Sequence, residues 1–404
     1  MIGAACAYYL ARDGWRVTVV DRGAFGRGCS HANCGYVCPS HVLPMAGPGA
    51  VVLGLKALLA RNAPLTIRPR LDPALWGWLW RFARRCNRRH VLEAGRGIQA
   101  LLMSSRRLYE DLLRAEGIEC EWEARGLLIV FRSPAAFEHY TETAELLGRE
   151  FGVRATRLAG ETLVAREPAL LPGLPGGWLY DGDAHLRPDR LMAELRRVLL
   201  SRGVEIREHL DAHSVARENG RGRALIVTGG EIEADGFVLA TGALAPEWGG
   251  VLGCRLPIQP GKGYSITMPR PARCPFFPMI FEEDRVAVTP FRSGYRLGST
   301  MEFAGYDSSL DPRRLDLLTN AARLYLHDSG ASPIEERWFG WRPMTPDSLP
   351  IIGRSPALPN LWIAAGHNML GLSMAPATGQ LVAELLSERP PHIDPAPYAP
   401  TRFQ

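Results

Sequence analysis

The chain has 404 residues, of which 46% are hydrophobic and 22% are charged, the balance of a soluble enzyme long enough for two domains. Its formal net charge of +5 is small for this length and gives no reason to expect a nucleic-acid partner. The sequence contains no apolar run of the roughly 18 residues that a membrane-spanning helix needs, and no signal peptide. The 8 cysteines lack the regular spacing of a disulfide framework, so we expect a reducing, cytoplasmic setting.

The first 21 residues predict the second half of a βαβ unit that binds a dinucleotide. Small, helix-favouring residues predict a helix over 3–12, which the turn at 13–14 ends. The β-branched run 15–20 predicts a buried strand ending at Asp21, whose carboxylate would accept hydrogen bonds from an adenine ribose. Gly3 takes the place of the last glycine of a G-x-G-x-x-G turn, so we expect the first strand and two further glycines, about ten residues, to lie upstream.

Signals for parallel and antiparallel sheets alternate along the rest of the chain. The predicted helices are 72–89, capped by Asp72, then 98–116, 136–152, 187–203, 311–328 and 375–386. The predicted strands are 126–131, 204–206, a hairpin with a buried strand over 224–243, several short strands in 255–305, and 361–367.

This interleaving predicts an α/β fold combined with an α+β part, arranged as two discontinuous domains. A Rossmann-like domain with a central parallel sheet would comprise 1–48, 183–255 and 336–404. A mainly antiparallel substrate or cap domain would comprise 49–182 and 256–335.

Two later segments predict further glycine turns beside the same ligand. "LATGA" (239–243) follows an apolar strand, and its glycine would let the backbone pass close to a cofactor. In "LWIAAGHNMLGLSMAPATGQLVAELL" (361–386), a strand, a glycine-rich loop and a helix opening at 375–379 would bring free N–H groups and a positive helix end to one point. Each turn alone also fits an ordinary strand–turn–helix, but three aimed at one ligand are more specific.

Three stretches together resemble the FAD-dependent D-amino-acid oxidase/dehydrogenase superfamily. They are the helix and strand ending at Asp21, "WRPMTPDSLPIIG" (341–353) and "GHNMLGLSMAPATG" (366–379), and the resemblance covers nearly the whole chain. "CSHANCGYVCPSHVLP" (29–44) and "PGKGY" (260–264) are most similar to the small, catalytic subunits of bacterial D-amino-acid dehydrogenases. Relatives that act on glycine, sarcosine and D-hydroxyproline share most of these features.

The resemblance implies non-covalent FAD and assigns residues to it. Those expected around the cofactor are Gly3, Asp21, Arg22, Ser30, Asn33, Gly35, Leu210, Thr241, Gly242, Gly366, Met369, Gly371 and Leu372, with Ser30, Asn33 and Gly35 against the flavin ring. Arg342 occupies the position of an arginine that pairs with the substrate carboxylate, which a guanidinium fork matches bidentately, although a surface ion pair is the plainer alternative. Lys262 and Tyr264 are candidates for polar work in the pocket, and a purely structural turn is an equal alternative.

The activity that the resemblance implies is oxidation of the CH–NH bond of an amino acid in amino-acid catabolism. The α-hydrogen would leave as hydride to flavin N5, and water would hydrolyse the imino acid to a keto acid and ammonia. We expect a D-amino acid of the D-alanine, D-proline or D-hydroxyproline type as substrate. The alternative within the class is a glycine/sarcosine-type oxidase that produces hydrogen peroxide. The alternative from another class is an N-terminally truncated, non-catalytic flavoprotein-like subunit.

The loop around residue 35 also has a spacing typical of metal ligands, H-x2-C-x3-C-x2-H, formed by His31, Cys34, Cys38 and His41. Because the resemblance places this loop against the flavin, and a short Cys/His spacing is an incomplete signature, we expect no metal. His31 also lies near the position where some relatives attach flavin covalently, but its distance to Gly35 is one residue too long. The cysteine that other relatives use falls near 341–342, where this chain has Trp and Arg, so non-covalent FAD is preferred.

The helix 75–89 suggests a peripheral contact with a membrane. Apolar residues occupy one helical face and Arg81, Arg84, Arg85 and Arg88 another, as in helices that lie on anionic lipid. The alternative is an internal helix whose apolar face packs on the protein. Relatives of the dehydrogenase type are often membrane-associated, so the resemblance implies a quinone or a partner subunit as electron acceptor and a place at the inner face of the cell membrane.

Overall fold

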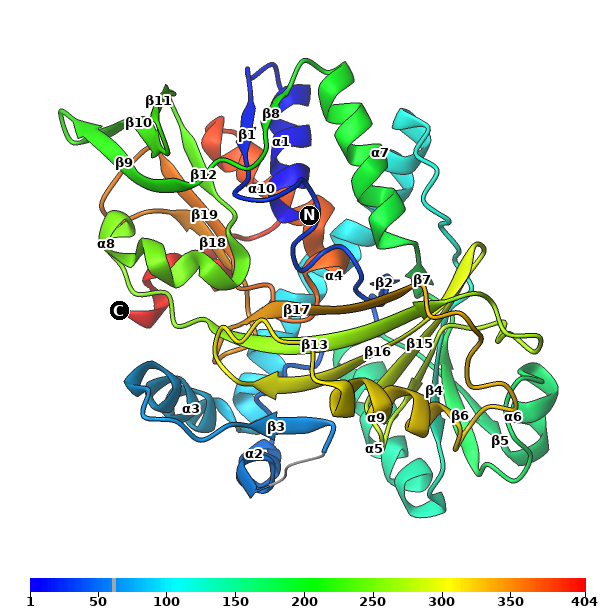
Figure 1. Ribbon diagram of the computed structural model, residues 1–404. Helices are drawn as coiled ribbons and strands as arrows, with labels where there is room; N and C mark the ends of the chain where they lie inside the picture. The colour runs from blue at the N-terminus through cyan, green and yellow to red at the C-terminus, as the bar shows by residue number, and fades with distance from the viewer. Residues whose placement is uncertain (60–62) are drawn as a thin grey trace.

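The computed structural model describes residues 1–59 and 63–404. Parallel strand pairs lie in its upper part in Figure 1, packed against three helices. The strands are β1 (Thr18–Val20) with β8 (Glu205–Arg207), and β12 (Phe237–Leu239) with β19 (Leu361–Ala365), which also pairs antiparallel with β18 (Ile351–Arg354). The helices are α1 (Ile2–Arg12), α7 (Pro188–Ser201) and α10 (Gly371–Leu386).

Smaller elements complete this part of the molecule. An antiparallel sheet consists of β9 (Ala212–Glu218), β10 (Arg221–Val227) and β11 (Gly230–Glu233). The short helices η1 (Gly242–Trp248) and α8 (Gly249–Leu252) follow β12, and η2 (Ala396–Tyr398) and η3 (Pro400–Phe403) end the chain.

A large mixed sheet forms the other half of the molecule (Figure 1). Its order is β17 (Glu336–Met344), β13 (Gln259–Met268), β16 (Gly294–Phe303), β15 (Val286–Phe291), β14 (Met279–Phe281), β4 (Leu127–Phe131), β6 (Gly176–Tyr180) and β5 (Thr156–Ala159), with β3 (Leu65–Ile67) also paired to β16. Neighbouring strands are antiparallel except β4 with β14 and β3 with β16. A two-stranded ladder, β2 (Tyr36–Val37) with β7 (Ala184–His185), lies near the junction with the parallel part.

Helices cover both faces of the large sheet. One face packs with α9 (Pro312–Ala322) and α6 (Gly160–Arg166) in a hydrophobic core, and the other packs with α4 (Arg88–Glu116) and α5 (Pro134–Phe151) in a second core. The latter core also includes side chains of α1 and α10 and therefore joins the two halves. At the lower left of Figure 1, α2 (Ala50–Leu59) and α3 (Pro73–Arg85) pack around Trp78 in a smaller core.

The combination of parallel strand pairs and a large, mainly antiparallel sheet confirms the predicted fold class. The domain boundaries stay a prediction. Several elements differ from expectation, among them β1, α4 and α2. β1 is half-buried rather than buried, because one of its edges pairs with β8 while the other faces a cavity. α4 begins at Arg88, where Asn87 caps it, and not at residue 98. α2 has no counterpart among the predicted helices.

The start of α10 is also earlier than predicted. The sequence predicted a helix opening at 375–379, but the helix begins at Gly371 and contains Pro376. Its free N–H groups therefore belong to the loop that follows β19.

The close contact between α1 and α10 predicts that adding a methyl group at Gly379 destabilises the protein. A Cβ at Gly379 would lie 2.6 Å from the backbone C and O of Ala5, so Gly379→Ala must push the helices apart. We expect a loss of about 1–3 kcal/mol in the free energy of unfolding, measured by denaturant titration. Gly148→Ala in α5 is the matched control, because its Cβ meets nothing closer than 3.9 Å and alanine favours the helix. Equal stability of the two variants would contradict this account.

Candidate active site

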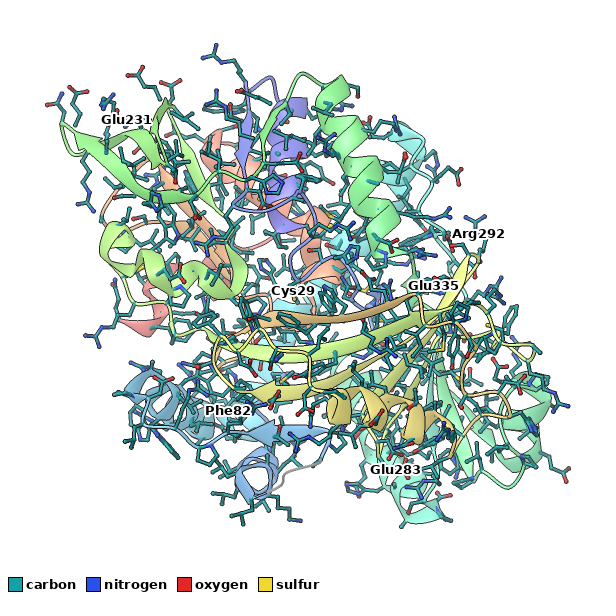
Figure 2. All side chains as sticks on the ribbon, in the orientation of Figure 1. Cys29, Phe82, Glu231, Glu283, Arg292 and Glu335 are labelled. Carbon is teal, nitrogen blue, oxygen red and sulfur yellow. The ribbon has the colours of Figure 1, made fainter. Side chains whose placement is uncertain are left out.

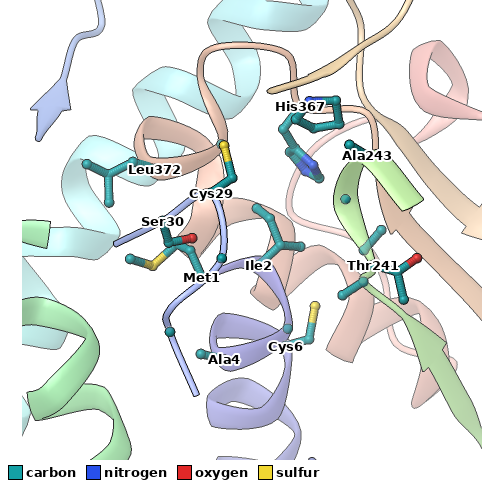
Figure 3. A pocket seen from close by; sticks show the side chains of 18 of the residues that line it. Met1, Ile2, Ala4, Cys6, Cys29, Ser30, Thr241, Ala243, His367 and Leu372 are labelled. Atoms are coloured by element: carbon teal, nitrogen blue, oxygen red, sulfur yellow. The ribbon is translucent and has the colours of Figure 1, made fainter. Parts of the chain in front are cut away.

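A cavity of about 1660 Å³ lies between the parallel strands and the large sheet. The first turn of α1, the loop after β1, the end of β12 and the start of α10 meet at it, as the positions of Ile2, Ser30, Thr241 and Leu372 in Figure 3 show. β1 and β12 both line it along their unpaired edges. In Figure 2, Cys29 marks the place where the loop enters between the two halves.

Most of the predicted site residues line this cavity. They are Gly3, Asp21, Arg22, Ser30, Asn33, Gly35, Leu210, Thr241, Gly242, Met369, Gly371, Leu372, Tyr264 and Arg342. Gly366 and Lys262 are not among the lining residues. Segments more than 300 residues apart in sequence therefore meet at one cavity.

The cavity walls suit a bound dinucleotide. The N-termini of α1 and α10 both reach it, and each helix start leaves backbone N–H groups without an intrahelical partner, together with a positive helix end. Such ends favour the negative charge of a diphosphate. Oδ1 of the Asp21 carboxylate accepts a hydrogen bond from the Gly23 N–H at 2.9 Å. The backbone carbonyl of Asp21 accepts one from the Leu210 N–H at 3.0 Å.

The loop 29–38 is fixed by side chains of the large sheet. Ser265 Oγ donates to the Ala32 carbonyl at 2.8 Å, Thr289 Oγ1 to the Cys34 carbonyl at 2.6 Å, and Arg296 Nη1 to the Asn33 carbonyl at 2.8 Å. Gly35 has a φ of 76°, and a Cβ there would lie 2.0 Å from the Leu186 carbonyl oxygen. This position therefore requires glycine, which lets the loop pack closely against the backbone of Leu186.

Arg342 lies on β17 with its guanidinium against the neighbouring strand. Its Nη1 donates to the Thr300 carbonyl at 2.7 Å. A Cβ on Gly263 would lie 2.3 Å from the guanidinium carbon, so Gly263 provides the space in which the arginine lies. Burial lowers the pKa of Arg342, against the opposing effect of the Cys29 and Cys34 thiols. Within the described part of the chain, the remaining N–H donors of this half-buried cation have no protein partner and can bind an anionic ligand.

The structure gives Lys262 and Tyr264 other partners. Residues alternate across β13, and the Tyr264 hydroxyl donates to Glu302 Oε2 at 2.8 Å. The Lys262 ammonium pairs with Asp307 and donates to the Ser309 carbonyl. Neither the ammonium nor the hydroxyl is brought to the cavity as a free group. The residue of the "PGKGY" motif that matters for the site geometry is Gly263, and only the pairing of β13 with β17 reveals this.

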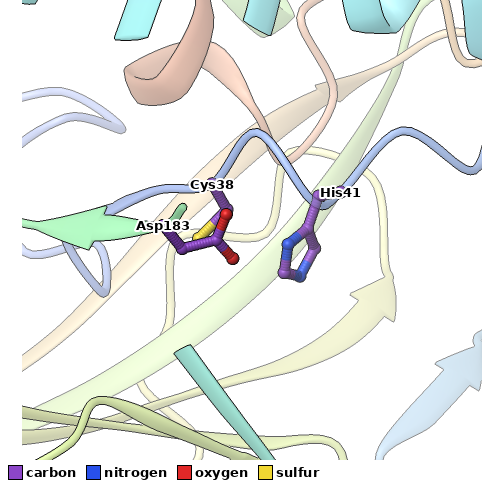
Figure 4. A group of neighbouring side chains, drawn as sticks. All are labelled: Cys38, His41 and Asp183. Atoms are coloured by element: carbon purple, nitrogen blue, oxygen red, sulfur yellow. The ribbon is translucent and has the colours of Figure 1, made fainter. Parts of the chain in front are cut away.

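The four residues of the metal-like spacing do not come together. His31 Nε2 lies 2.7 Å from Glu336 Oε1, while Cys34 lies against Gly298. Cys38 and His41 instead meet Asp183, and the three could offer ligand atoms to one ion (Figure 4). Ser40 fills the middle of this group, donating to Asp183 Oδ2 at 2.5 Å with His41 Nδ1 at 3.2 Å, so a hydrogen-bond network accounts for it.

Burial sets the protonation of this network. It raises the pKa of Asp183 to about 7, against the hydrogen bonds from Ser40, and lowers the pKa of His41 to about 4. Asp183 could not be associated with this loop from sequence, because it lies far along the chain in the turn before β7.

Comparison with known proteins identifies the family. The model of the FAD dependent oxidoreductase family matches residues 1–385. The chain belongs to this family. It is 39% identical over 407 residues to a D-amino acid dehydrogenase of Paramagnetospirillum magneticum, covering 97% of this chain and 94% of the relative. It is 36% identical to a D-amino acid dehydrogenase of Xanthobacter autotrophicus, covering 100% and 97%.

Solved structures show the same fold. The glycine oxidase from Geobacillus kaustophilus superposes with a TM-score of 0.79 at 22% identity, over 99% of this chain and 96% of that one. The L-proline dehydrogenase from P. horikoshii superposes with a TM-score of 0.72 at 20% identity, over 100% and 95%. The chain is therefore an FAD-dependent oxidoreductase, and the dinucleotide that suits the cavity is FAD.

The Asp183 network predicts a pH dependence of stability. The folded state keeps this carboxyl protonated up to about pH 7, whereas the unfolded chain releases the proton near pH 4, so rising pH favours unfolding between these values. From pH 5 to 7, wild type should lose roughly 2–3 kcal/mol relative to Asp183→Asn. Denaturant titrations at several pH values measure the difference. Exposed Asp316→Asn is the control, and a pH profile shared by all three proteins would refute the assignment.

Proposed function

We propose that the chain oxidises a D-amino acid to the imino acid, which water converts to the keto acid and ammonia. D-Alanine, D-proline and D-hydroxyproline are the substrate types that we infer. The observation that carries the proposal is the half-buried Arg342 guanidinium in the FAD cavity, because its remaining donors match an α-carboxylate. The names of the relatives, D-amino acid dehydrogenases at 33–39% identity, support the same substrate class.

In this mechanism the protein binds and orients the amino acid, and FAD, when bound, accepts a hydride equivalent. The residues that would hold FAD are those at the starts of α1 and α10, in the loop 29–38 and at the end of β12. Arg342 fixes the carboxylate and so directs the α-carbon toward the ring.

The amine must lose its proton before the α-hydrogen can leave as hydride. Tyr264 and Lys262 do not offer a free base, and burial lowers the pKa of His367 to about 3 while its Nε2 lies 3.0 Å from Thr378 Oγ1. We therefore propose that the substrate reacts with a neutral amine, whose proton goes to water.

Substitution of Arg342 tests this function. We expect anaerobic D-alanine or D-proline to bleach the flavin bands of the wild-type holoenzyme. Arg342→Gln should lower kcat/KM at least 100-fold, because a charge-assisted bidentate bond is worth about 3 kcal/mol in a buried site. Arg337→Gln is the control, since Arg337 is exposed on the same strand and outside the cavity.

The same experiment separates the alternatives. Hydrogen peroxide formed in air at the rate of turnover would indicate a glycine/sarcosine-type oxidase. A purified chain without flavin would support a non-catalytic subunit. Bleaching that is unaffected in Arg342→Gln would overturn the assigned role of Arg342.

We further propose that electrons pass to a quinone or a partner subunit, and that the cytoplasmic protein lies on the inner face of the cell membrane. No helix in the described residues 1–59 and 63–404 is both long and apolar enough to cross a bilayer. The sequence predicted a membrane contact through helix 75–89, but the structure buries the apolar face of that helix. Leu75 and Trp78 of α3 are buried against the protein, so its outer surface consists of Trp76, Trp80 and arginines.

The neighbouring helix α2 supplies the apolar surface. Val51, Val52, Leu53, Leu55 and Leu59 are all exposed, with Leu59 at 88%. Apolar patches of this kind mark sites of interaction. Residues 50–92 also contain nine basic residues and one acidic residue, which favours an anionic lipid surface over a neutral one.

Vesicle sedimentation tests this contact. Wild type should bind vesicles containing 30 mol% phosphatidylglycerol, and Leu53→Glu/Leu55→Glu should lower the bound fraction at least tenfold without loss of flavin reduction. Leu324→Glu is the control, because Leu324 is similarly exposed on another surface. Equal binding of both variants would refute a contact through α2.

A further inference from the structure

The cavity continues beyond Arg342 across the face of the large sheet. Adjacent strands each contribute a lining side chain, in sheet order Ser299 of β16, Ala287 of β15, Ile280 of β14, Ile129 of β4 and Tyr180 of β6. Ala287, Ile280 and Ile129 are direct cross-strand partners and form a continuous apolar row. We call this part of the cavity the side branch. α5 also lines it, through Tyr140, Thr143 and Leu147.

A charged pair lines the side branch at the turn between β14 and β15. Glu282 Oε1 lies 2.7 Å from Arg285 Nη1. The exposed fraction of the side chain is 24% for Glu282 and 57% for Arg285, so the pair lies where the branch meets solvent. Two opposite charges thus stand beside each other at an opening otherwise lined by apolar and tyrosine side chains.

Unlike Glu282, the next two acidic residues, Glu283 and Asp284, form hydrogen bonds that stabilise the fold. Glu283 accepts from the backbone N–H groups of Arg132 and Ser133 before α5, and Asp284 accepts from the Tyr325 hydroxyl at 2.7 Å. Within the described part of the chain, the Glu282 carboxylate has Arg285 alone as partner. Glu282 is therefore the one of three consecutive acids that is left facing the cavity.

The backbone of Arg285 is connected to the Arg342 guanidinium through one residue, Thr300. The Thr300 N–H donates to the Arg285 carbonyl at 3.4 Å, and the Thr300 carbonyl accepts from Arg342 at 2.7 Å. Glu282, Arg285 and Arg342 line the same cavity, so a ligand that leaves the charged pair can reach the donors of Arg342 through the branch.

We propose that Glu282 and Arg285 form an entrance site that binds the amino-acid zwitterion before it reaches Arg342. Glu282 takes the ammonium and Arg285 the carboxylate, and the apolar row then favours passage inward with the side chain on Ala287 and Ile280. Adjacent opposite charges at the mouth of an apolar cavity raise the local concentration of a dipolar ligand. The inference rests on the proposed oxidation of amino acids.

Kinetics of the charge-neutralised variants test the entrance site. Glu282→Gln and Arg285→Gln should each raise the KM for D-alanine about 5–20-fold and leave kcat within twofold, since the pair acts on binding and not on the reacting atoms. Raising salt to about 0.5 M should increase the KM of wild type toward that of the variants, because the charges are then screened. Glu93→Gln is the control, since Glu93 forms an exposed pair with Arg89 at the same 2.7 Å outside the cavity.

Three outcomes overturn the proposal. An unchanged KM in both variants means that the pair binds no substrate. A lower kcat at constant KM means that it supports the reacting geometry. If no amino acid reduces the bound flavin of the wild-type enzyme, the proposed function itself is refuted. This result is obtained before any variant is made.

Discussion

The cavity depends on the close approach of α1 and α10 at Gly379, where the two helices meet backbone to backbone. Both helices begin at the cavity, so this contact fixes the relative position of two sets of free N–H groups and two positive helix ends. Among the described residues, the pair β1–β8 and the pair β12–β19 belong to separate sheets. The helices therefore carry the alignment between the two sides of the cofactor cavity.

The large sheet positions the opposite wall. Three of its side chains, Ser265, Thr289 and Arg296, donate to successive carbonyls of the loop that faces the cavity. The same sheet carries Arg342 on its outermost strand, β17. One rigid element thus sets both the cofactor-facing loop and the carboxylate-binding group, and their separation does not depend on loop conformation.

Local patterns in the sequence were sufficient for most helices and strands, and a family motif pointed to Arg342. They were not sufficient where the partners of a side chain depend on pairing between distant strands. Lys262 and Tyr264 lie in a motif and carry polar groups, which made them candidates for the site. In the structure, Lys262 pairs with Asp307 and the Tyr264 hydroxyl donates to Glu302. Gly263 has no functional group that would mark it as a site residue. Its role, to leave space for the Arg342 guanidinium, follows only from the contact between the two residues. α2 was missed because it is apolar on nearly every side and lacks the polar face by which surface helices are recognised.

The half-buried Arg342 guanidinium accounts for an irregularity in β16. Lys262 pairs with Glu302 and Tyr264 with Ser299, so one intervening residue of β13 lies opposite two of β16, which is a β-bulge. Ser299 and Thr300 both have positive φ there, at 96° and 49°. This backbone costs energy for residues with side chains, but it turns the Thr300 carbonyl to the Arg342 guanidinium. One neutral carbonyl compensates only part of the lost hydration of a guanidinium. A carboxylate can supply the rest, so the strain in β16 and the affinity for an anionic substrate have the same origin.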